Sequence, residues 1–165
     1  MKRFIAPILI LTALSGCGLQ PLYSGGSKGA VASTLGSVSV DAIEGKSGWL
    51  MRNALNDRLR AGDGAARYRL TVALDDQIDG FGVRADDTIT RERRTLRARY
   101  QLVDTTTGAT VIDATAGSDA GIDVVSSEYA TIAGENSALE NLTQRVADQI
   151  VTRLSLYARG ANNGE

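Results

Sequence analysis

The 165-residue chain contains no histidine and only one cysteine. Without histidine, serine–histidine hydrolysis and histidine-based acid–base catalysis are excluded, and the usual zinc sites lose their ligands. One cysteine cannot form a disulfide within the chain. The formal net charge is −1, so the overall balance implies no polyanionic partner such as nucleic acid, although local clusters of charge can still bind one. The longest apolar run, residues 4–14, is shorter than the roughly 20 residues that cross a bilayer. These absences predict a protein that is not an enzyme and carries no metal or other cofactor.

The first seventeen residues have the layout of a secretory leader. Lys2 and Arg3 form a positive start, the apolar run follows, and small residues lead to Cys17. The closing sequence Leu-Ser-Gly-Cys resembles the lipobox of bacterial lipoproteins, in which the cysteine is acylated and becomes the first residue of the mature chain. We therefore predict a signal peptide over residues 1–16 and a covalent lipid on Cys17. The alternative is an ordinary buried thiol near the cleavage site of a soluble protein.

The rest of the chain has the length of one domain behind a linker. Residue 18 is glycine; an aspartate there favours inner-membrane retention in enteric bacteria, so its absence favours the outer membrane, facing the periplasm. Residues 17–36 are rich in Gly and Ser and predict a flexible, lipidated tether. We expect one domain over residues 37–158 and a disordered tail over 159–165.

Hydrophobic periodicity predicts an α+β fold. The expected elements are a strand at 37–43, a helix at 49–60, strands from 68 to about 75, at 88–103 and at 109–116, and a long closing helix. Short links between the last three strands indicate an antiparallel meander. We therefore expect two helices packed on one face of a four-stranded, mainly antiparallel sheet. The polar stretch from Asp75 to Asp87 is interpreted as a strand end and turn. Trp49 is interpreted as a core or rim anchor, with an interface role as the alternative.

The strand at 88–103 separates apolar from cationic side chains. Its residues Leu96, Ala98, Tyr100 and Leu102 alternate with Arg97, Arg99 and other polar residues, so one face is apolar and the other positive. Six arginines are the candidate binding residues on this face and on the matching face of the preceding strand: Arg67, Arg69, Arg91, Arg93, Arg97 and Arg99.

Several segments, in order along nearly the whole chain, resemble the lipopolysaccharide-assembly lipoprotein family LptE, most closely its alphaproteobacterial branch. They are Cys17 to Tyr23, Thr90-Arg91, Ala98 to Leu102, Thr107-Gly108, Ser127 to Ala130, and Ala147 to Leu154. The resemblance implies an α+β fold with two helices on a four-stranded sheet and no enzymatic activity. It also implies an outer-membrane lipoprotein that sits partly inside the β-barrel LptD, acting as a plug, an assembly aid and a binder of lipopolysaccharide.

Under that resemblance the arginines have three readings. Guanidinium groups bind phosphate bidentately, which suits the phosphorylated lipid A and inner core of lipopolysaccharide. Alternatively, they form a solvated face paired with Asp113 or Asp75, or they contact the polar lumen of a barrel. The rival function is that of a generic envelope-maintenance lipoprotein that binds another periplasmic or outer-membrane protein.

Overall fold

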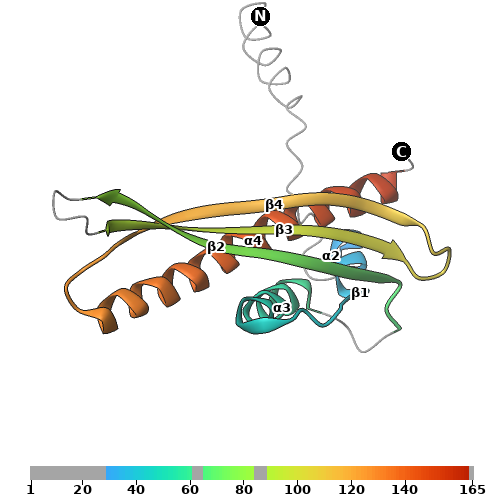
Figure 1. Cartoon of the computed structure of the whole chain (residues 1–165). Coiled ribbons are helices and arrows are strands. Elements are labelled where there is room, and N and C mark those ends of the chain that lie inside the picture. Colours follow the sequence, from blue (N-terminus) through green and yellow to red (C-terminus); the bar gives the residue numbers. More distant parts are fainter. Residues whose placement is uncertain (1–28, 61–64, 84–88, 164–165) are drawn as a thin grey trace, which may run out of the picture.

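The computed structural model describes residues 29–60, 65–83 and 89–163, and the leader with Cys17 lies outside this part. Four strands and three helices follow one another along the described chain (Figure 1). In order they are α2 (Ala30–Gly36), β1 (Val38–Val40), α3 (Gly45–Leu59), β2 (Tyr68–Val83), β3 (Ile89–Asp104), β4 (Thr110–Asp123) and α4 (Glu128–Asn163).

The four strands form one sheet in the order β1-β2-β3-β4. Strands β2, β3 and β4 are long and antiparallel, and β3 is paired on both sides along nearly its whole length. Tyr68 lies opposite Asp104 at one end of the β2–β3 pair, and Phe81 lies opposite Arg91 near the other. The predicted meander of three consecutive strands is therefore confirmed.

The sheet is mixed rather than mainly antiparallel, because β1 runs parallel to β2. The prediction missed this pairing although the order strand, helix, strand implies it. A helix that packs on the sheet between two neighbouring strands carries the chain back to the end at which the first strand began. The second strand then runs in the same direction as the first. Helix α3 is that crossover between β1 and β2.

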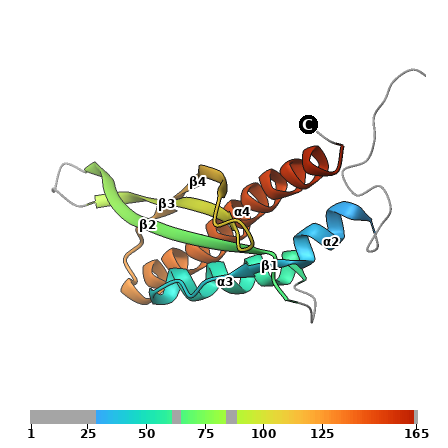
Figure 2. The ribbon, with the colours of Figure 1, turned by 90° about the vertical axis from the view of Figure 1, so that its right-hand side faces the viewer.

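Both long helices pack on the same face of the sheet, as predicted. Helix α4 contacts β3 and β4, and α3 contacts β1, β2 and α4 (Figures 1 and 2). The α4 stripe supplies five fully buried side chains, Leu139, Leu142, Val146, Ile150 and Leu154, against the apolar face of β3. Burial of each such side chain stabilises the fold by about 1.5–3 kcal/mol. The opposite face of the sheet carries no helix in the described ranges.

Several predicted boundaries are corrected. The third helix, α2, lies within the segment assigned to the tether, and its Leu35 is buried in the core. Strand β2 continues through Asp75 to Val83, where a turn was expected. Helix α4 continues to Asn163, so most of the predicted disordered tail is helical.

Trp49 is 64% exposed on α3 and is not a core residue. Across the described ranges, no helix combines the length and apolar character needed to cross a membrane.

Candidate functional site: the open face of the sheet

The face of β2, β3 and β4 that points away from the helices is called the open face here. On β3 it carries Arg91, Arg93, Arg97 and Arg99, because the apolar residues Leu96, Ala98, Tyr100 and Leu102 alternate with them and are buried under α3 and α4. Side chains on a strand alternate between faces, so burial of one set fixes the exposure of the other. The sequence prediction of a cationic β3 face is consistent with this burial pattern.

Two of these arginines pair with aspartates of β4. The Nη2 of Arg99 lies 3.2 Å from Oδ2 of Asp113, and the Nε2 of Gln101 donates to the same oxygen over 2.9 Å. These hydrogen bonds, that from Arg99 first, lower the pKa of Asp113 below its usual value. Farther along β3, the Nε of Arg91 donates to Asp123 over 3.1 Å. Both pairs are solvent-exposed, and such pairs typically contribute only about 0–1 kcal/mol. They can therefore exchange partners at little cost.

Two further arginines contact aromatic rings. The Arg93 guanidinium lies 5.4 Å from the ring centre of Phe81, and that of Arg67 lies 5.1 Å from the ring centre of Tyr68. Arg67 also contacts Asp104 over 3.4 Å. Tyr68 and Asp104 are both buried at the end of the sheet. Arg67 differs from the other five candidate arginines because it contacts these two buried residues.

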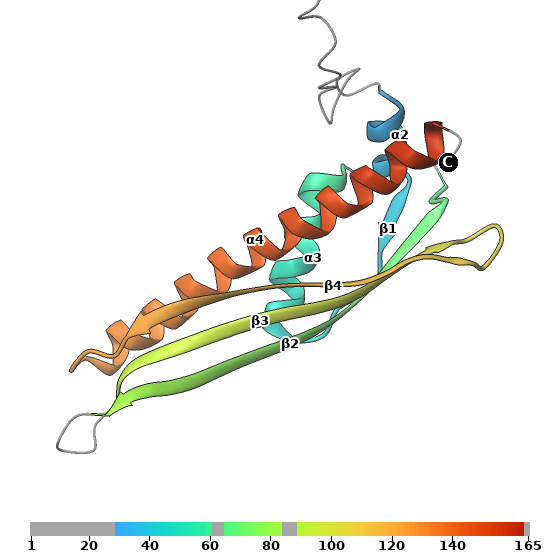
Figure 3. The same ribbon diagram turned by 90° about the horizontal axis from the view of Figure 1, so that it is seen from above.

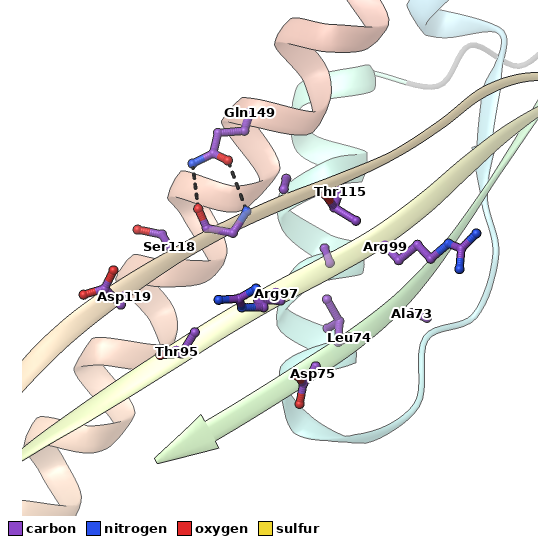
Figure 4. A pocket seen from close by; sticks show the side chains of 13 residues that line it. Ala73, Leu74, Asp75, Thr95, Arg97, Arg99, Thr115, Ser118, Asp119 and Gln149 are labelled. Carbon is purple, nitrogen blue, oxygen red and sulfur yellow. Dashed lines mark hydrogen bonds between the residues drawn. The ribbon is translucent and has the colours of Figure 1, made fainter. Parts of the chain in front are cut away.

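Arg69 and Arg97 are exposed, and within the described chain neither has an ion pair or a side-chain hydrogen bond. Arg97 lies across from Asp75 on β2 without forming an ion pair with it. Arg97 and Arg99 line a hollow of about 600 Å³ on the open face, beside Thr95 (Figure 4). An unpaired guanidinium in a hollow has all its donors available for an incoming anion.

Arg94 is an additional charged residue that the sequence analysis did not single out. It lies on the helix-covered face of β3, where its Nε and Nη2 donate to both carboxylate oxygens of Asp76 over 2.8 and 2.7 Å. Its Nη1 donates to the main-chain carbonyl of Glu135 over 2.9 Å, which ties the start of α4 to the hairpin. The hydrogen bond to Asp76 is the main cause of the raised pKa of Arg94. The sequence signal for this role was its position in the strand alternation, which places Arg94 on the same face as Leu96 and on the face opposite to Arg93.

Two acidic residues of the segment that was interpreted as a turn lie on opposite faces of β2. Asp76 is a partly buried ion-pair partner rather than a turn residue, whereas Asp75 is exposed beside Arg97. Across residues 29–60, 65–83 and 89–163, no three His, Cys, Asp or Glu side chains gather into a group that could hold a metal ion.

Folds similar to this one are found in solved bacterial lipoproteins. A protein of Caulobacter crescentus CB15 described as a lipoprotein has 28% sequence identity and a TM-score of 0.68, over 81% of this chain and 98% of that one. The minor lipoprotein of Acinetobacter baumannii has 16% identity and a TM-score of 0.59, over 72% of this chain and 90% of that one. Rare lipoprotein B of Shewanella oneidensis has 12% identity and a TM-score of 0.58, over 78% and 98%. The last two likenesses concern the fold alone.

Residues 35–154 match the family model of LptE, described as lipopolysaccharide-assembly. The chain belongs to this family. A comparison with curated proteins finds no match. Family membership confirms the predicted resemblance and the coarser functional prediction of a lipopolysaccharide-assembly lipoprotein. The family is not enzymatic and has no known cofactor, in agreement with the prediction.

Arg94 and Arg97, three residues apart on opposite faces of β3, should differ sharply in their effect on stability. Arg94→Ala removes three hydrogen bonds and leaves Asp76, whose side chain is only 19% exposed, without its partner. Hydrogen bonds to charged groups contribute roughly 1.5–3 kcal/mol, so we expect the free energy of unfolding to fall by about 2 kcal/mol. Arg97→Ala is the control and should change it by less than about 0.5 kcal/mol. Urea denaturation measures both; equal losses would contradict the assignment of Arg94 as the structural arginine.

Proposed function

We propose that this chain is an outer-membrane lipoprotein, lipidated at Cys17 and facing the periplasm. It forms a plug-and-assembly partner of an LptD-type β-barrel, and it binds lipopolysaccharide during insertion into the outer leaflet. The observation that carries the proposal is the open face of a member of a lipopolysaccharide-assembly family. It is a long, uncovered sheet surface on which Arg69 and Arg97 have neither an ion pair, a side-chain hydrogen bond nor a ring contact within the described chain.

Phosphate recognition on the open face depends on which of its arginines already hold an aspartate. Arg97 can approach a phosphate oxygen without first breaking an ion pair, and Arg69 is exposed in the same way. Arg91 and Arg99 hold exposed carboxylates that a phosphate can displace, because the pairs are weak. The face therefore attracts anions mainly through Arg69 and Arg97 and can recruit the paired arginines afterwards.

The barrel partnership draws on the same surface. The interior of a transmembrane β-barrel is polar, and a sheet face with exposed Arg, Asp, Gln and Thr side chains can hydrogen-bond to it. The lipid anchor supplies the membrane attachment, since each buried methylene of an acyl chain contributes about 0.8 kcal/mol and stable anchoring takes more than one chain. The globular domain is then free to present its polar surface to its partners.

Loss of the acylated cysteine should release the protein from the membrane. Cys17→Ser removes the thiol that carries the lipid, so we expect most of the protein to move from the membrane pellet to the soluble fraction. Labelled palmitate should follow the wild-type protein and not the variant. Persistence of the variant in outer-membrane fractions would count against anchoring through Cys17.

Removal of the two unpaired arginines should weaken lipopolysaccharide binding. For the double variant Arg69→Ser/Arg97→Ser we expect at least a tenfold rise in Kd, measured by capture of purified lipopolysaccharide on the immobilised protein. The charge-matched control is Arg52→Ser/Arg153→Ser, which changes exposed residues on α3 and α4, and its Kd should stay within about twofold. Unchanged capture by the first variant would contradict the binding proposal. Equal losses of affinity in both variants would mean that binding depends only on net charge.

Affinity capture should test the partnership independently of lipopolysaccharide. We expect the tagged protein to bring down a large β-barrel protein that resists heat dissociation in mild detergent, and depletion of the chain should lower surface lipopolysaccharide. A tagged lipoprotein with the same leader and an unrelated domain is the control. If no barrel co-purifies and surface lipopolysaccharide is unchanged, the rival role in general envelope maintenance is favoured.

A further inference from the structure

Strand β4 is the last strand of the sheet, so one side of its backbone has no neighbouring strand. At the middle of this edge, the side-chain amide of Gln149 on α4 substitutes for one. Its oxygen accepts from the N–H of Gly117 over 3.3 Å, and its nitrogen donates to the carbonyl of Gly117 over 3.2 Å (Figure 4). This pair of bonds is what one residue of an added strand would make. The edge at Gly117 is thus already paired, by a side chain.

Beyond Gly117 the same backbone edge continues without a partner. The N–H and C=O groups of alternate residues on a strand point to the same side, so those of Asp119, Gly121 and Asp123 point outward as those of Gly117 do. Val124, which follows Asp123, points the other way, as this alternation requires: its N–H donates to the carbonyl of Thr90 on β3. Among the described hydrogen bonds, no partner lies on the outward side of these three residues.

A groove runs along this part of the edge. It lies between β4 and α4, which run side by side (Figure 3), and it has a volume of about 350 Å³. On the α4 side it is lined by Gly134, Ala138 and Leu142 and by a polar stripe at four-residue spacing, formed by Ser137, Asn141 and Arg145 and continued by Gln149. Residues four apart on a helix share a face. Asn141 and Arg145 have no side-chain hydrogen bond within the described chain, so both are available to an occupant.

We propose that the β4 edge from Asp119 to Asp123 binds a short extended segment of a partner protein by strand addition, with basic side chains at alternate positions. In this binding mode main-chain hydrogen bonds supply affinity and alternating side chains supply specificity. One set of the partner's side chains lies over the open face beside two exposed carboxylates. Asp119 has no ion pair within the described chain, and the pair of Asp123 with Arg91 is exposed and weak, so a basic group of the partner can bind Asp119 and compete for Asp123. The other set enters the groove beside Asn141 and Arg145, where small polar groups fit.

The charge of the edge also argues against a second copy of this chain as the occupant. Strand β4 contains Asp113, Asp119 and Asp123 and no basic residue. Two such edges placed side by side would bring like charges together, which destabilises cross-strand pairs. The inference stands apart from the identity of the partner in the proposed function, because it specifies only the chemistry of the segment.

The variant Gly121→Pro tests the strand addition. Proline removes the outward N–H and places its ring where the added strand must lie, yet it spares the bonds to β3, because that N–H faces solvent on an edge strand. The matched control is Gly121→Ala, which keeps the N–H and meets no atom within 4 Å of its added Cβ. A second variant, Asp119→Lys/Asp123→Lys, leaves the backbone unchanged and removes the charge complementarity.

The probe is a heptapeptide in which lysine alternates with threonine, and the comparison peptide has glutamate in place of lysine. Hydrogen exchange of the backbone amides is followed in the full-length chain in non-ionic detergent. We expect the lysine peptide to slow exchange at Asp119 and Asp123 at least tenfold in wild type and in Gly121→Ala. The protection should be lost in Gly121→Pro and in the double lysine variant, and the glutamate peptide should give none.

Three results would overturn the proposal. The first is no protection by the lysine peptide, and the second is equal protection in Gly121→Pro. The third is a concentration-dependent dimer, seen by sedimentation, that disappears in Gly121→Pro, because it would assign the edge to a second copy.

Discussion

The two-residue alternation of β3 is the constraint on which the molecule depends. This strand is paired on both sides, and one set of its side chains is buried under the helices while the other is open. A slip of one residue would carry Arg97 and Arg99 into the core and expel Leu96 and Ala98. Burial of an unpaired guanidinium costs several kcal/mol, so the apolar set fixes the register. The position of the open face therefore follows from the packing of the opposite face.

Arg94 is a charged residue on the helix-covered face of β3, where the other positions nearer the core are apolar. Toward the hairpin end the helix-covered face is no longer purely apolar, and the bond network of Arg94, Asp76 and the carbonyl of Glu135 replaces hydrophobic contacts between hairpin and helix. The charged guanidinium can be accommodated here because each of its three nitrogen atoms donates a hydrogen bond. The hairpin is thereby carried beyond the hydrophobic core while it remains attached to α4.

Periodicity predicted the elements that have an apolar face, and it failed where polar residues replace apolar ones. The stripe from Leu139 to Leu154 and the alternation from Leu96 to Leu102 each indicated both the element and its buried side. The continuation of β2 beyond Asp75 was interpreted as a turn, because Asp76 looks solvated until its partner, eighteen residues away, is known. The parallel β1 edge was available from topology but not from composition, since three residues carry too little pattern. On the candidate site, the strand alternation placed the β3 arginines, whereas the division into paired and unpaired ones depends on the cross-strand register.

The spacing of the unpaired arginines indicates what kind of ligand the open face suits. On β2, Arg69 lies opposite Val103, and Arg97 lies opposite Asp75, six residues farther along. At about 3.3 Å per residue the two positions are roughly 20 Å apart, so one phosphate cannot reach both. Neutralisation of Arg91 and Arg99 by neighbouring aspartates also keeps the face from forming a concentrated positive site. A small phosphorylated metabolite would gain little from such a surface. A large ligand with several separated anionic groups, or an extended polar wall, can engage both arginines at once, and these are the two kinds of partner that the proposed function assigns to the open face.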